Sequence, residues 1–267
     1  MPRSIWNGAI TFGLVTIPVG LYSAIDEKDF RFNQLHGEDS GRIRYKKVCS
    51  KCDKEISSDE IVKGYEIEKD KYVVFDEEEL AAIPSESGKA IDIVAFVPLE
   101  QIDPVYFQRP YYLAPESTGI KAYKLLEKAL SDSGRVGLAK ISIRDKERLA
   151  TLRVKDGLFI LETMHWPDEI RQPEFEALEK NPEIRPAEVA MAQSLIENLS
   201  EDFHPEGFID EYRQRLELAV EAKVAGEEIT FTPTQAPTQI LDLMEALKAS
   251  VDATKGRAAA REESRTA

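Results

Sequence analysis

The order of the predicted elements along the 267-residue chain constrains the fold most. Segments rich in β-branched and aromatic residues, separated by turn residues, follow one another up to residue 165 and are typical of short strands. Beyond that point the pattern changes to helices alone. A run of strands broken by one or two helices and then followed by helices is typical of a β-barrel or sandwich with a helical appendage. The sequence therefore predicts a mixed, mainly β fold.

Turn and capping residues set the limits of these elements. Asp76 predicts the start of a short helix, with Glu79 as its capping-box partner, and Thr118 predicts the cap of a helix that runs to Ser131. Lys155-Asp156-Gly157 predicts a tight turn between two strands. The predicted strands are residues 5–12, 15–22, 61–68, 71–75, 91–97, 111–114, 135–144, 149–154 and 158–165.

Three helices are predicted in the C-terminal part. Pro186 begins one that ends near Leu199, and a second runs from Phe208 to Ala225. A third, at residues 238–253, has an apolar stripe along one face. No repeated unit is visible in the sequence.

Charge is distributed unevenly along this acidic chain, whose formal net charge is -14. Residues 41–54 and 135–155 each carry a local charge of +5, whereas residues 162–228 carry -12. Binding follows the local field and not the total. An acidic protein with two basic segments is therefore compatible with a nucleic-acid site.

Several classes of protein are disfavoured. No apolar run approaches the roughly 20 residues that span a bilayer, and the N-terminal residues do not resemble a signal peptide. Two cysteines in a chain of this length favour a reducing compartment, so a cytoplasmic protein without membrane association is predicted. There is no phosphate loop, nucleophile elbow or metalloprotease motif, and we predict no enzymatic activity.

The first basic segment has the pattern of a polyanion site. Arg42, Arg44 and Lys46 alternate with Ile43 and Tyr45, which in an extended strand would place the cations on one face and the apolar residues on the other. A row of cations suits a nucleic-acid backbone. The alternative is a solvated edge strand whose cations prevent aggregation. The predicted DNA contacts are Arg42, Arg44, Lys46, Lys47 and Lys51.

A second, weaker set of predicted DNA contacts lies in the second basic segment. It comprises Arg144, Lys146 and Arg148. The alternative interpretation, solvated loop charges, explains this group equally well.

A cysteine pair lies within the first basic segment. Cys49-x-x-Cys52 is half of a tetrahedral zinc site, and His36 and Asp39 are the nearby residues that would complete it. The alternative is two reduced thiols in a turn. No cofactor is required by the sequence, and zinc is the metal that this set of residues would hold.

Five blocks of the sequence, the first of which has two parts, resemble bacterial Ku in that family's order. They are Ile5-Trp6-x-Gly8, the segment from Phe12 to Ser23, Gly41 to Cys49, Ile61 to Tyr65, Ile102-Asp103-Pro104 with Tyr111-Tyr112-Leu113, and Trp166 to Arg171. The chain departs from the family pattern at Asn33, where many relatives have His, and at Asp39, where some have Cys.

The resemblance implies a Ku-type β-barrel core with a bridging arm. It implies a homodimer that threads as a ring onto double-stranded DNA ends in non-homologous end joining and recruits an ATP-dependent DNA ligase through C-terminal residues. We accordingly expect residues 1–175 to form the barrel and bridge, 176–226 a helical dimerisation region, and 227–267 a ligase-interaction segment. The alternative is a zinc-containing, acidic protein-interaction scaffold without end-specific DNA binding.

Overall fold

The computed structural model describes residues 3–83, 88–143 and 146–227, and the helix predicted at 238–253 lies outside these residues. The chain divides into two compact units, Met1–Gln172 and Pro173–Ala267. In the described residues, all the strands lie in the first unit. The three-part functional division expected from the sequence stays a prediction.

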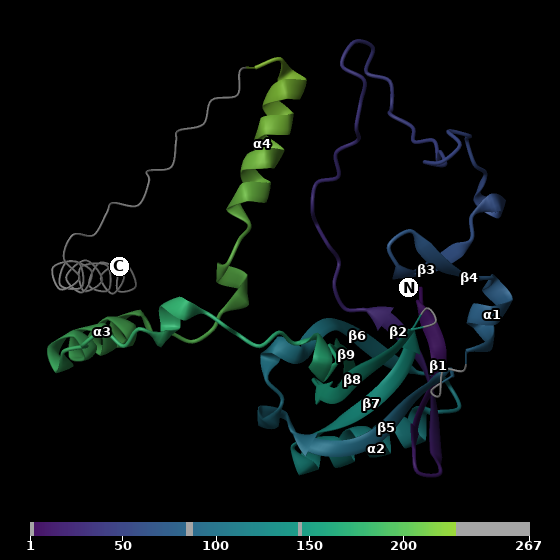
Figure 1. Ribbon diagram of the computed structural model, residues 1–267. Coiled ribbons are helices and arrows are strands. Elements are labelled where there is room, and N and C mark those ends of the chain that lie inside the picture. The colour runs from purple at the N-terminus through teal and green to yellow at the C-terminus, as the bar shows by residue number, and fades with distance from the viewer. Residues whose placement is uncertain (1–2, 84–87, 144–145, 228–267) are drawn as a thin grey trace. The chain divides into compact units, whose positions relative to one another are not determined.

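Seven strands of the first unit form a closed barrel in the order β1-β2-β6-β9-β8-β7-β5 (Figure 1). The barrel strands are β1 (Trp6–Phe12), β2 (Val15–Ser23), β5 (Ala90–Pro98), β6 (Phe107–Pro115), β7 (Arg135–Ile143), β8 (Lys146–Lys155) and β9 (Leu158–Met164). A separate two-stranded sheet contains β3 (Lys63–Glu68) and β4 (Lys71–Phe75). The predicted barrel is confirmed.

The barrel closes through one parallel pairing. Ala9, Ile10 and Thr11 of β1 lie beside residues 90–92 of β5, while every other pair of neighbouring barrel strands is antiparallel. Thr11 reinforces the junction, because its hydroxyl donates a hydrogen bond of 2.9 Å to Asp92 Oδ1. Closure therefore joins strands that are about 80 residues apart in the sequence, a separation that makes loop closure costly in entropy.

The hairpin between β8 and β9 has the turn predicted from the sequence. Lys155 pairs with Leu158 across the turn. Asp156 and Gly157 both have positive φ, at 52° and 75°. This combination is required by the type I′ turn, whose twist matches that of the flanking strands.

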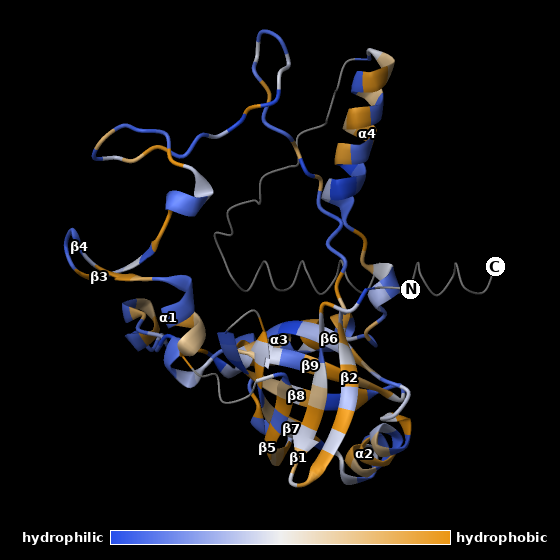
Figure 2. Cartoon of the chain, turned by 90° about the vertical axis from the view of Figure 1, so that its right-hand side faces the viewer, coloured by the Kyte–Doolittle hydropathy of each residue, from blue (hydrophilic) through white to orange (hydrophobic). Residues whose placement is uncertain are grey.

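Alternate residues of the barrel strands form one apolar core. Ile17, Val19 and Leu21 of β2 are fully buried, as period-two alternation requires. Figure 2 shows the apolar residues along the barrel strands in orange. The other buried members are Ile10, Ile91, Ile93, Leu113, Ala139, Ile141, Ala150, Leu152, Phe159 and Leu161 of the strands and Tyr123, Leu126 and Leu130 of α2.

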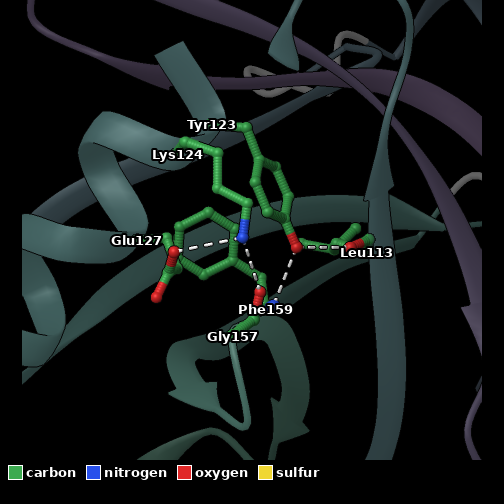
Figure 3. Close-up of polar contacts among 6 residues, drawn as sticks. All are labelled: Leu113, Tyr123, Lys124, Glu127, Gly157 and Phe159. Carbon is green, nitrogen blue, oxygen red and sulfur yellow. Dashed lines mark hydrogen bonds and ion pairs between the residues drawn. The ribbon is translucent and has the colours of Figure 1, made fainter. Parts of the chain in front are cut away.

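Helix α2 (Ile120–Ser133) is fixed to the barrel by Tyr123. The Tyr123 hydroxyl donates to the Leu113 carbonyl and accepts from the Phe159 amide, both at 2.8 Å (Figure 3). The Tyr123 and Phe159 rings also meet edge to face at 4.5 Å between centroids. Burial raises the pKa of Tyr123, so its hydroxyl keeps the proton that it donates.

Capping explains where the short helix begins and corrects one prediction. Helix α1 (Glu77–Ala82) has the predicted capping box: Asp76 accepts from the Glu79 amide at 2.7 Å, and Glu79 accepts from the Asp76 amide at 3.0 Å. The prediction that Thr118 caps α2 is wrong, because Gly119 occupies the cap position and offers no side chain.

The second unit contains α3 (Pro186–Leu199) and α4 (Glu211–Ala225). Pro186 begins α3 as predicted, but α4 begins three residues later than expected, where the Asp210 side chain accepts from the Arg213 amide at 2.9 Å. Neither helix has a buried residue. Among the described helices, none combines the length and apolarity needed to cross a membrane.

Replacing Tyr123 with Phe is expected to lower the free energy of unfolding by about 1–3 kcal/mol, because the Leu113 carbonyl and the Phe159 amide each lose a buried partner. Urea unfolding of the two proteins measures the difference. Tyr112→Phe, at a side chain that is 40% exposed, is the control and should leave stability nearly unchanged. Equal losses in both variants would show that the two buried hydrogen bonds contribute nothing.

Candidate nucleic-acid interface

The first basic segment lies on an arm, residues 24–89, that begins after β2 and ends at β5. None of residues 24–83 is buried. The arm therefore has no apolar core of its own in this range, and its side chains are accessible to a ligand.

The first basic segment starts at the end of one tight turn and ends within a second. In the first turn, residues 35–42, Leu35 and Arg42 make an isolated β-bridge. In the second turn, residues 48–55, Val48 and Glu55 do the same. The connection between the turns, residues 43–47, carries Arg44, Lys46 and Lys47.

The prediction of an extended strand through Arg42 and Lys46 is wrong, because no named strand occupies the described residues 24–62. The apolar face expected opposite the cations is absent as well. Ile43 and Tyr45 are 44% and 80% exposed. Lacking a neighbouring strand, the segment turns twice instead of extending.

The cations of the first basic segment are all exposed. Arg42 lies in the bridge of the first turn, and Lys51 lies within the second turn. Lys46 Nζ lies 2.7 Å from Glu55 Oε2, but both side chains are more than half exposed, so this pair contributes little to stability. A bound polyanion can therefore take the place of Glu55 beside Lys46 at a small cost in free energy.

The second set of predicted contacts lies on a different element. Lys146 is the first residue of β8 and is exposed, whereas Arg148 is partly buried and donates from Nη1 to Gln108 Oε1 at 3.0 Å. Arg144 lies outside the described residues. The contact roles of both sets stay predictions.

Ion pairs reduce the positive charge of the barrel strands in a way that the sequence does not reveal. Arg153 Nε lies 2.9 Å from Glu162 Oε2 across β8 and β9, and Lys140 Nζ lies 3.4 Å from Glu147 Oε1 across β7 and β8. Glu162 lies outside the basic segment that we counted from the sequence. Strand register is the signal that identifies these partners. Because these barrel cations are paired, the first basic segment, residues 41–54, is the more available positive surface.

The residues predicted to bind zinc lie in the same two turns. His36 Nδ1 is 3.0 Å from Asp39 Oδ1 in the first turn. In the second turn the backbone amides of Lys51 and Cys52 hydrogen-bond to the Cys49 sulfur and lower the pKa of its thiol, which favours the thiolate that binds metals. In residues 3–83, 88–143 and 146–227 no three His, Cys, Asp or Glu side chains come together to hold a metal ion, so the two pairs are not assembled into one site.

The family model described as "Ku70/Ku80 beta-barrel domain" matches residues 11–191, which include the arm and the barrel strands from β2 onward. The chain belongs to the Ku family. The resemblance seen in the sequence is thereby confirmed, together with the mainly β, barrel-centred fold.

Three bacterial Ku relatives are similar along most of this chain. Proteins named "Non-homologous end joining protein Ku" from Frankia casuarinae, Desulfitobacterium hafniense and Bacillus subtilis are 48%, 45% and 43% identical to it. The matches cover 95%, 94% and 95% of this chain. They cover 64%, 88% and 83% of those relatives, so the chain spans less than two thirds of the Frankia protein.

Proposed function

We propose that this protein binds the ends of double-stranded DNA as a homodimeric ring in non-homologous end joining, without enzymatic activity of its own. The observation that carries the proposal is membership of the Ku family, with relatives named for non-homologous end joining. The exposed cations of the arm support it, because phosphate contacts bind DNA of any sequence.

The connectivity of the arm is suited to encircling DNA. The arm starts at the end of β2 and ends at β5, so both of its ends are anchored in the barrel. A segment anchored twice forms a loop around a ligand and not a free tail. Two such arms, one from each protomer, would complete the ring.

The surface of the second unit supports dimerisation. Helices α3 and α4 have no buried residue, and large apolar side chains remain exposed on them and on the segment between them. Exposed apolar surface of this extent marks an interaction site. The side chains concerned are Ile196, Leu199, Phe203, Phe208, Ile209, Tyr212 and Val224.

A gel-shift assay that compares linear duplex with a covalently closed circle of the same sequence tests the threading. Binding to the linear form alone, weakening steeply with added salt, is expected, because a closed ring needs an end to enter and phosphate contacts release counterions. Equal binding to both forms would identify an open groove, and binding to neither would overturn the proposal.

Replacing Arg42, Arg44 and Lys46 together with Glu is expected to weaken binding to linear duplex by about 100-fold or more, because the variant loses phosphate contacts and gains repulsion. Fluorescence anisotropy measures the affinity, and sedimentation verifies the dimer. The matched control carries Glu at three exposed cations elsewhere, Lys121, Lys128 and Lys155. Wild-type affinity in the arm variant would exclude these residues as contacts.

We also propose that residues 227–267 recruit the ATP-dependent ligase, supported by the apolar stripe in the sequence of residues 238–253. Deleting residues 227–267 is expected to leave DNA binding unchanged and to abolish stimulation of the ligase. Nick-sealing assays with and without the deleted segment measure the stimulation. Full stimulation by the shortened chain would place ligase recruitment elsewhere.

A further inference from the structure

The two turns of the arm repeat one backbone structure, although their sequences share no residue at any equivalent position. Each spans eight residues, and the second follows the first by 13 positions. In both turns the β-bridge joins the first residue to the last, Leu35 to Arg42 and Val48 to Glu55. The repetition is therefore in the backbone and not in the identity of the residues.

The internal hydrogen bonds of the turns match as well. The amide of the second residue donates to the carbonyl of the seventh, and the amide of the sixth donates back to the carbonyl of the second. These pairs are His36–Gly41 at 2.8 Å and Ser40–His36 at 2.9 Å, then Cys49–Lys54 at 3.0 Å and Asp53–Cys49 at 2.9 Å. The sixth residue has positive φ in both turns, 57° at Ser40 and 54° at Asp53. Neither of these is a glycine, so each turn imposes a conformation that side chains disfavour.

Side chains of the types that bind zinc occupy the same two positions of each turn, the second and the fifth. They are His36 and Asp39 in the first turn and Cys49 and Cys52 in the second. In the first turn, the Gly41 amide donates a hydrogen bond of 2.8 Å to Asp39 Oδ1, which holds this carboxylate in the turn. Ligand pairs separated by two residues in tight turns are the building blocks of tetrahedral zinc sites.

The arm cannot be stabilised by burying apolar side chains, so another interaction must hold its fold. None of residues 24–83 is buried, and the apolar residues at the base of the turns, Leu35 and Val48, are 52% and 55% exposed. Isolated hairpins without a core are marginally stable. Metal binding is a common way to stabilise a segment that cannot bury enough apolar surface.

We propose that the two turns close on one divalent metal ion of the zinc class, held by His36, Asp39, Cys49 and Cys52. The described residues do not show the four ligands together, so binding would bring the turns toward each other about the connection at residues 43–47. The ion replaces the thiol protons of both cysteines, which leave to solvent.

The proposed site would order the basic segment. Residues 43–47 join the two ligand pairs, so closing the turns holds Arg44, Lys46 and Lys47 as one group. This consequence rests on the proposed DNA-binding function, whereas the metal site itself does not. Metal binding is therefore measured without DNA, and DNA-end binding is measured separately with metal-loaded and metal-free protein.

The test uses the full chain, freed of metal with a chelator and titrated with Co²⁺ and then Zn²⁺. Tetrahedral cobalt–thiolate absorption that disappears on adding zinc, and one zinc per chain by elemental analysis, are expected. Cys49→Ser should abolish the cobalt spectrum. His36→Gln and Asp39→Asn should each weaken zinc binding by about 10-fold or more, since even residues that merely orient ligands contribute that much.

Glu38→Gln and Ser50→Ala, at non-ligating positions of the two turns, are the matched controls and should bind zinc as the wild type does. Circular dichroism verifies that each variant retains the barrel. Absence of zinc binding would overturn the site. One zinc per two chains with no effect of His36→Gln would overturn it too, because the ion would then lie between the cysteine pairs of two chains. Loss of DNA-end binding with intact zinc binding would overturn only the proposed function.

Discussion

The parallel pairing of β1 with β5 is the interaction on which the rest of the structure depends. It joins Ala9–Thr11 to residues 90–92 and so converts a curved sheet into a closed barrel. The same pairing defines the arm, because residues 24–89 must leave and re-enter the barrel near this junction. Without it, β5 would have no partner on one side, and the arm would be anchored firmly only at β2.

The cations of the barrel strands and those of the first basic segment lie in different electrostatic environments. Arg153 and Lys140 of the barrel lie beside carboxylates of neighbouring strands, at 2.9 and 3.4 Å, so these two cations are neutralised locally. The cations of the first basic segment are solvated, and the ion pair between Lys46 and Glu55 is exposed. A net charge of -14 then repels polyanions from most of the surface, while the local charge of +5 at residues 41–54 attracts them.

Local signals in the sequence predicted local structure well. Segments rich in β-branched and aromatic residues predicted the barrel strands, Asp76 and Glu79 predicted the start of α1, and Asp156-Gly157 predicted a turn. Barrel closure was not predictable in detail, because parallel pairing across 80 residues has no local pattern. The strand expected at residues 42–46 was wrong because a strand needs a neighbouring strand to pair with. Arg42 to Lys46 has the alternation of a strand, but no named strand lies beside it in the described residues 24–62. The residues of the candidate site could be selected by charge, whereas their arrangement on two equivalent turns could not.

Because residues 24–83 have no buried core, the arm can adapt to DNA, but ordering it on DNA is costly in entropy. A loop that must accept a DNA end benefits from flexibility, yet every arm residue that becomes ordered on DNA costs conformational entropy and lowers the affinity. Order imposed beforehand on the basic segment reduces that cost. The repeated turns fix the backbone around His36 and Cys49, and residues 43–47 join the two turns. A link between the turns would therefore strengthen DNA binding most where the cations are densest, while leaving the remainder of the arm free to open.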